Sequence, residues 1–244
     1  MKKSLTFLAS IVILATASPA TAMNKKEPRF TRVIVDQLEA RDSDDGTVMA
    51  WEASAWHGGD INKLFFSTEG ERLMAPEHDD EDPSTESAET RLAWNHAFAP
   101  FWDGQLGVRR DWQPNDPSRD WVSVGVQGIA PYWFEVDANL FVGEDGLTNL
   151  RIEAEYELML TQKLVLAPNL ETNLYGKDDD KRGIGNGLTD IEAGLRLRYE
   201  IRREIAPYIG VHWEKLYGDT ADIAQANGEK TEQGIIVAGL RIWF

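Results

Sequence analysis

Residues 149–174 show a two-residue alternation that decides most of what this chain can fold into. In the first half, apolar side chains fill one parity and mostly charged side chains fill the other. The apolar set is Leu150, Ile152, Ala154, Tyr156, Leu158 and Leu160, and the polar set is Asn149, Arg151, Glu153, Glu155 and Glu157. After Thr161 and Gln162 the alternation resumes through Leu164, Leu166, Leu170 and Leu174. This pattern predicts a hairpin of two strands, each with one oily and one charged face.

The same alternation recurs through the rest of the chain, without a repeat unit or a linker. We predict about twelve strands and no helix, because no apolar stripe of helical period runs for any length. The predicted strands cover residues 30–41, 47–57, 62–71, 88–97, 102–112, 119–129, 132–142, 148–160, 163–175, 188–201, 205–217 and 231–244.

The connections between these strands alternate between tight and long. Breaks near residues 58–60, 98–100, 130–131, 161–162 and 202–203 are tight. Those at 42–46, 72–86, 113–118, 143–146, 176–187 and 218–230 are mostly longer and rich in Asp, Gly and Pro. An outer-membrane barrel needs this parity, whereas a soluble sandwich has no reason to obey it. We therefore predict an all-β, antiparallel, up-and-down outer-membrane barrel whose oily face meets lipid.

The first residues are typical of an exported protein. Lys2 and Lys3 precede an apolar run over residues 5–17, and Ala20 and Ala22 frame a small-residue cleavage site. We predict a signal peptide at 1–22, a short segment at 23–28 and the barrel at 29–244. The chain has no cysteine, which suits a route through an oxidising periplasm.

The last strand also indicates an outer-membrane protein. Its apolar parity is Ile236, Ala238, Leu240, Ile242 and Phe244, ending on an aromatic residue as in the signal for outer-membrane insertion. We expect a monomeric barrel in contact with outer-membrane lipid and lipopolysaccharide.

The predicted inward face is densely charged. Its main members are Glu89, Arg91, Asp103, Arg109, Glu135, Arg151, Glu153, Glu155, Glu192, Arg196, Arg198 and Glu214. A barrel of about twelve strands filled by such long side chains has a constricted lumen. Two interpretations stay open: a structural plug of ion pairs, or a net acidic passage for cations. The acidic wall of residues 149–174 is expected to face Arg196, Arg198 and Arg241.

Several segments resemble the copper-resistance protein B family. They are VDQLEAR at 35–41, GVRRDW at 107–112, GVQGIAPYWFEVDANLFVGEDG at 125–146 and the whole of residues 156–222. The resemblance implies an outer-membrane barrel that binds copper, works with periplasmic copper-resistance proteins and protects the periplasm against excess copper. Members often carry a Met- and His-rich segment before the barrel, and residues 23–28 do not supply one.

Scattered residues must then hold any metal. Imidazole serves Cu(II) and other ions, and thioether sulfur favours Cu(I). The candidates are His212 at mid-height in the lumen, Met159 nearer the periplasmic end, and Met74 with His78 in the acidic loop MAPEHDDEDP. Each has a simpler alternative: a hydrogen-bonded histidine, a packing methionine or a solvated loop. No pair has a tight ligand spacing.

Other function classes fit less well. Acidic residues outnumber basic ones 41 to 25, which argues against nucleic acid. No histidine stands in an H-x-S pair, so a lipid-face serine hydrolase is not expected, and we predict that the protein is not an enzyme. The remaining hypotheses are a copper-binding barrel with an acidic lumen, and a structural or general-solute barrel without a dedicated metal site.

Overall fold

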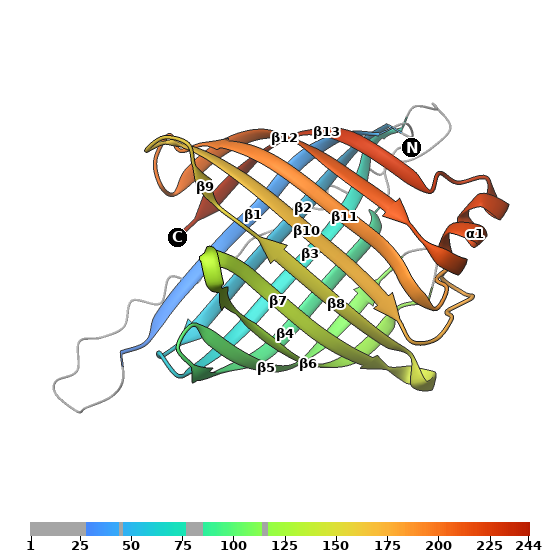
Figure 1. Ribbon diagram of the computed structural model, residues 1–244, viewed down its shortest axis with the longest axis horizontal. Coiled ribbons are helices and arrows are strands. Elements are labelled where there is room, and N and C mark those ends of the chain that lie inside the picture. The colour runs from blue at the N-terminus through green and yellow to red at the C-terminus, as the bar shows by residue number, and fades with distance from the viewer. Residues whose placement is uncertain (1–27, 44–45, 77–84, 114–116) are drawn as a thin grey trace, which may run out of the picture.

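The computed structural model describes residues 28–43, 46–76, 85–113 and 117–244 of the chain. It is a closed, tilted antiparallel β-barrel, as predicted (Figure 1). The predicted signal peptide, and the segment that follows it up to residue 27, lie outside the described residues.

Neighbouring strands follow one another along the chain around the wall. They are β1 (Phe30–Ser43), β2 (Gly46–Gly58), β3 (Asn62–Pro76), β4 (Thr85–Ala99), β5 (Trp102–Trp112), β6 (Arg119–Ala130), β7 (Phe134–Gly143), β8 (Thr148–Glu155), β9 (Leu158–Met159), β10 (Leu164–Tyr175), β11 (Gly187–Tyr199), β12 (Ile205–Leu216) and β13 (Glu232–Trp243). Short 3-10 turns, η1 (Pro131–Trp133) and η2 (Glu144–Gly146), flank β7. Because β8 and β9 both pair with β10, these segments make a barrel of 12 strands.

The barrel closes between its first and last strands. Ile34 of β1 is paired with Trp243 of β13. Val33 and Phe244 exchange both backbone hydrogen bonds, at 3.1 and 2.8 Å. Closure leaves no sheet edge along this seam, which is what a hydrocarbon environment requires.

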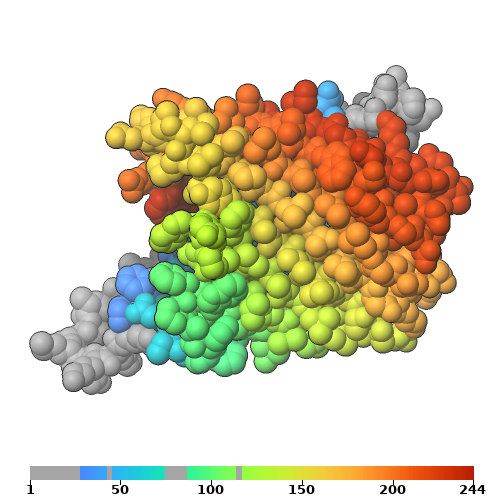
Figure 2. Space-filling view, viewed as in Figure 1, coloured from blue at the N-terminus to red at the C-terminus, as the bar shows by residue number. Residues whose placement is uncertain are grey.

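The two faces follow the predicted parity. Apolar side chains such as Leu92, Val122, Ile209 and Ile236 point outward and are exposed, while charged and amide side chains turn inward. Figure 2 shows the outward side chains of β7 to β11 covering one side of the wall. The buried apolar cluster is small and lies at the long-loop end, where Trp121, Phe141 and Leu147 pack with Tyr175. The interior is therefore held mainly by polar contacts.

The prediction of one unbroken strand over 148–160 was wrong. The strand ends at Glu155 and resumes as β9 at Leu158, after a gap of two residues. On the opposing strand Pro168 has no N–H to donate, although its carbonyl accepts from Tyr156 N at 3.0 Å. The strand pairing with β10 is therefore interrupted at Tyr156 and Glu157.

The expectation of no helix was also wrong. Helix α1 (Gly218–Asn227) fills the last long connection and stops at Gly228, which adopts a left-handed φ of 82°. With ten residues and no marked apolar face, α1 gives almost no periodic signal. Among the described residues, no helix is both long and apolar enough to cross a membrane.

Candidate cation route in the lumen

Arginine side chains cross the lumen and tie distant strands together. Arg196 of β11 binds both oxygens of Glu39 on β1, each at 3.0 Å. The same carboxylate accepts from Arg41 Nε at 2.8 Å and from the Tyr208 hydroxyl at 2.9 Å. Glu39 is 1% exposed, so its charge is removed from water and balanced by these donors.

A second cluster fills the half of the lumen walled by β4 to β8. Arg109 contacts Asp111 at 2.7 Å and Glu89 at 3.1 Å, and its guanidinium lies 4.2 Å from the centre of the Phe141 ring. Arg151 contacts Glu89 at 3.0 Å from the other side. Nearby, Arg91 donates to amide oxygens and lies 3.8 Å from a carboxylate oxygen of Asp137. This half of the lumen is closely packed.

Carboxylates on adjacent strands stand directly opposite one another in two rows. The first carboxylate ladder is Asp137, Glu153, Glu171, Glu192 and Glu214, on β7, β8, β10, β11 and β12. The second carboxylate ladder is Glu52, Glu69, Glu89 and Asp111, on β2 to β5. Residues directly opposite in an antiparallel pair have Cβ atoms about 4.5–5.5 Å apart. Each row is thus a chain of closely spaced negative groups.

The first ladder climbs through the barrel. Asp137 lies near the start of β7, just after the short turn at η1, and Glu214 lies near the end of β12, just before α1. Because the strands are tilted, a row across them runs obliquely from the short-turn end to the long-loop end. In outer-membrane barrels the long loops face outside.

The acids and the arginines differ in exposure. The side chains of Glu153 and Glu192 are 40% and 34% exposed, whereas those of Arg109 and Arg196 are 2% and 7% exposed. Other ladder acids are as buried as the arginines: the side chains of Glu89 and Asp111 are 13% and 9% exposed, against 12% for Arg151.

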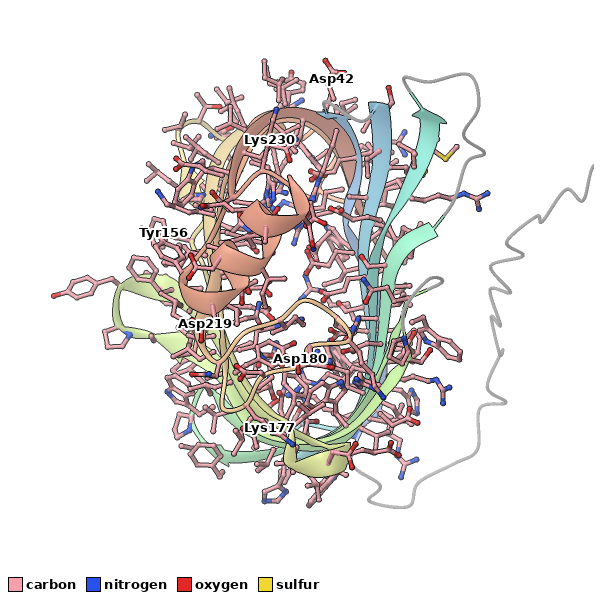
Figure 3. All side chains as sticks on the ribbon, turned by 90° about the vertical axis from the view of Figure 1, so that its right-hand side faces the viewer. Asp42, Tyr156, Lys177, Asp180, Asp219 and Lys230 are labelled. Carbon is pink, nitrogen blue, oxygen red and sulfur yellow. The ribbon has the colours of Figure 1, made fainter. Side chains whose placement is uncertain are left out.

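The loop between β10 and β11 folds over the long-loop end. Figure 3 looks at this end, where the segments carrying Asp180 and Asp219 cross in front of the barrel. Arg182 reaches in to Asp111 at 3.2 Å, and Asp179 is held by Arg119 through two hydrogen bonds of 2.6 and 2.8 Å. These Arg119 hydrogen bonds hold the pKa of the Asp179 carboxyl below its usual range.

Thr220 of α1 fastens the helix to this loop. Its hydroxyl accepts from the backbone N–H of Gly185 at 2.9 Å. The loop and α1 thus form one lid, which we define as residues 176–186 together with α1.

Comparison with known proteins identifies the family. The family model described as "Copper resistance protein B precursor (CopB)" matches residues 29–244. The chain is 48% identical over 212 residues to a copper resistance protein B of Escherichia coli, covering 87% of this chain and 69% of that protein. It is 44% identical over 211 residues to a copper resistance protein B homolog of Pseudomonas syringae pv. tomato, covering 86% and 69%.

The chain belongs to the copper resistance protein B family. Among solved structures, a NanC porin matches with a TM-score of 0.54 and 11% identity, over 87% of this chain and 99% of that one. At this identity the likeness concerns the fold alone. As a member of the copper resistance protein B family with a barrel of this type, the protein resides in the outer membrane.

In this member of the copper resistance protein B family, the predicted metal residues are spread out. His212 is 4% exposed inside the barrel, and its Nδ1 atom has no hydrogen-bond partner within the described structure. Met159 is 63% exposed on β9 and Met74 is 48% exposed near the end of β3. His78 lies outside the described residues. Across the part of the chain that the structure describes, no three His, Cys, Asp or Glu side chains converge into a metal-binding group.

The predicted polar network is placed as follows. Glu89, Arg91, Arg109, Arg151 and Glu153 meet in the packed half, while Glu192 and Glu214 lie in the upper part of the first ladder. Asp103 pairs with Lys63 at 2.7 Å, and Arg198 pairs with Glu155 at 3.5 Å and also with Glu157. Glu135 is exposed at the short-turn end. Of the arginines expected opposite the hairpin acids, Arg198 and Arg241 lie within ion-pair range of Glu157, but Arg196 turns to Glu39.

Glu39 is one lumen residue that sequence reasoning missed. A β-bulge between Val35 and Gln37 shifts the parity of β1, so Glu39 turns inward. The signal in the sequence is the pair of adjacent polar residues, Asp36 and Gln37, between apolar neighbours. Glu52 and Glu69 were missed as well, because their importance depends on cross-strand register.

Proposed function

We propose that this barrel binds copper ions in its lumen and passes them across the outer membrane, with the first carboxylate ladder as the route. The observation that carries the proposal is the continuity of that ladder from the short-turn end to the long-loop end. Family membership supports a role in copper resistance. We propose a non-catalytic, monomeric barrel among outer-membrane lipid and lipopolysaccharide, which exchanges copper with periplasmic copper-resistance proteins at its short-turn end.

The chemistry of the ladder suits a moving cation. Conduction needs sites that attract an ion strongly enough to admit it and weakly enough to release it to the next site. Successive acids whose Cβ atoms are about 5 Å apart provide such steps, because a hydrated cation leaving one group is already close to the next. The same row repels anions.

The arginine side chains that cross the lumen favour a narrow route over a wide pore. Arg91, Arg109 and Arg151 fill the half of the lumen walled by β4 to β8, and Arg196 crosses from β11 to Glu39 on β1. The lid is anchored over the β4 to β8 half through Arg182 and Arg119. The first ladder continues past them onto β10, β11 and β12. We propose that ions pass off-centre, along these strands.

The test is reconstitution of the mature protein in liposomes and planar bilayers. The wild-type barrel should show cation selectivity in its reversal potential and should admit copper. The double substitution Glu153→Gln and Glu171→Gln should reduce both several-fold, because it removes two consecutive steps. The matched control is Glu232→Gln, which removes a solvent-exposed charge paired with Lys215 at 2.7 Å.

Two results would reject the route. One is a wild-type barrel without cation preference, and the other is copper flux that the double substitution leaves unchanged. The alternative function is a general-solute or structural barrel without a dedicated metal site. The lack of a three-ligand metal group among the described residues favours it. It predicts equal flux of copper and other divalent ions.

A further inference from the structure

Lys63 and Asp103 form an ion pair at the short-turn end of the lumen. Each is the second residue of its strand, on β3 and β5, and each strand follows a short turn. The Lys63 Nζ atom lies 2.7 Å from Asp103 Oδ2, and the two side chains are 24% and 19% exposed. In outer-membrane barrels the short turns face the periplasm, so this pair stands at the periplasmic mouth of the lumen.

The strand register places Asp103 in line with the first carboxylate ladder. Asp137, the acid of that ladder nearest the short-turn end, stands directly opposite Gln127 on β6, and Gln127 stands directly opposite Asp103. Neighbouring strands are about 4.8 Å apart, so Asp103 lies two strand spacings, or about 10 Å, beyond Asp137. A cation that leaves Asp137 toward the periplasm therefore meets Asp103 as the next carboxylate of the row.

Arg91 and Arg151, which contact acids farther up this row, are each held by several groups. The Arg91 guanidinium lies 3.8 Å from Asp137 and donates to the Asn139 side chain at 2.6 Å. It is 7% exposed and also lies over the Phe141 ring. Arg151 is held by carboxylates of both ladders. Neither arginine can leave its place without breaking several contacts at once.

Lys63 is held in a different way. Within the described structure its ammonium has one ion-pair partner, Asp103, and lies 5.8 Å from the centre of the Trp56 ring. Trp56 has the same inward parity on β2 as the ladder residue Glu52. An ammonium within about 6 Å of an indole face is attracted to it. Because lysine carries a compact charge on a flexible stem, the ammonium can leave Asp103 and stay on the Trp56 ring.

A cation that enters from the periplasm competes with this ammonium for Asp103. A monovalent ion carries the same charge as the ammonium, which is tethered beside the carboxylate at a high effective concentration. The monovalent ion therefore displaces the ammonium poorly. A divalent ion carries twice the charge, so its attraction to the carboxylate doubles at the same distance. Displacement of the ammonium favours divalent ions.

We propose that Lys63 is a movable internal cation at the periplasmic mouth, which moves between Asp103 and Trp56 and makes the route select divalent over monovalent cations. This inference rests on the proposed function, because Asp103 ends the row that we assign to copper. In the structure the ammonium lies on Asp103. A divalent ion replaces it there, and the ammonium returns when the ion leaves.

The experiment uses the mature barrel in planar bilayers, with Cu(II) on one side and potassium on the other. The reversal potential gives the ratio of the two permeabilities, which should favour Cu(II) in the wild-type barrel. Lys63→Met should raise the potassium conductance and lower this ratio, each several-fold, because the competing charge is gone. Lys63→Arg keeps the charge and should retain more of the preference. The matched control is Lys215→Met, which removes a lysine paired with Glu232 at 2.7 Å on the outer surface and should change neither value.

Asp103→Asn provides an independent variant, and the heat-dependent migration of each variant in gels checks its folding. This substitution removes the carboxylate for which the ions compete, so both permeabilities should fall. Adding Lys63→Met to it should change the ratio less than Lys63→Met changes it alone. An unchanged ratio in Lys63→Met, or an equal change in Lys215→Met, would overturn the role of Lys63. An effect of Lys63→Met that is just as large without the Asp103 carboxylate would overturn the competition.

The double substitution Glu153→Gln and Glu171→Gln separates this inference from the proposed function. If it reduces copper flux while Lys63→Met leaves the permeability ratio unchanged, the role of Lys63 is rejected and the route stands. A wild-type barrel that admits no copper rejects the route itself.

Discussion

Arg151 on β8 and Glu89 on β4 form an ion pair across the lumen, with 3.0 Å between Nη2 and Oε2. The wall between these strands consists of β5, β6 and β7, so the contact is a strut through the interior. The same guanidinium lies 2.7 Å from Glu69 on β3 and 3.1 Å from Glu171 on β10. One side chain therefore links the two carboxylate ladders.

Replacing Arg151 with methionine should destabilise the barrel strongly. Removing one partner of a buried ion pair leaves the other charge uncompensated, at a cost of about 3–5 kcal/mol. We expect a clear fall in the urea midpoint of the refolded protein. The control is Arg110→Met, since the Arg110 and Asp120 side chains are 45% and 60% exposed and such a pair contributes only about 0–1 kcal/mol. Equal midpoints for the two variants would contradict the strut.

Replacing Tyr208 with phenylalanine should cost about 1.5–3 kcal/mol, the range for a hydrogen bond to a charged group. Its hydroxyl donates to the buried Glu39 carboxylate at 2.9 Å. Tyr199→Phe removes the same atom from a side chain that is 49% exposed on the lipid face, and should be nearly neutral. Thermal unfolding of both variants checks this. A loss as large in Tyr199→Phe would show that the Glu39 contact is not responsible.

The lid should open only in acid. Arg119 lowers the pKa of Asp179, so the carboxyl keeps its charge to lower pH in the folded protein than in the unfolded chain. The pair therefore stabilises the lid fully above about pH 4, the ordinary aspartate value, and this contribution is lost as the pH falls through the lowered folded pKa.

A single spin label can report this opening. Because the chain has no cysteine, K181C would carry the only reactive thiol, in the middle of the lid. The mobility of the label should stay constant from neutral pH to about pH 4 and rise below it. In Asp179→Asn the label should be mobile at every pH. A label that loosens near pH 6 would point to histidine titration instead.

Side-chain alternation was enough to predict the barrel, its lipid face and most of its lumen residues. The hairpin at residues 149–174 shows why. A bilayer on one side and a polar lumen on the other impose a two-residue period on every strand, and that period is written in the sequence. The two-residue alternation alone was enough to predict that Arg109, Arg151 and Glu192 point inward.

What alternation cannot provide is register, bulges and loop structure. The ladder from Asp137 to Glu214 exists only because five strands align their acids side by side, and strand offset leaves no trace in periodicity. The bulge in β1 shifts the two-residue alternation by one position and so turns Glu39 inward. The lid depends on Arg182 and Asp179 meeting partners that are distant in sequence.

The break between β8 and β9 also sets how deep the barrel can sit in the membrane. The pairing of β7 with β8 ends at Glu135 and Glu155, and β9 pairs only with β10. Below that level β9 has no neighbouring strand on the side of β7 within the described structure. Unpaired backbone groups cannot face hydrocarbon. The apolar layer of the bilayer must therefore end on the long-loop side of Glu155.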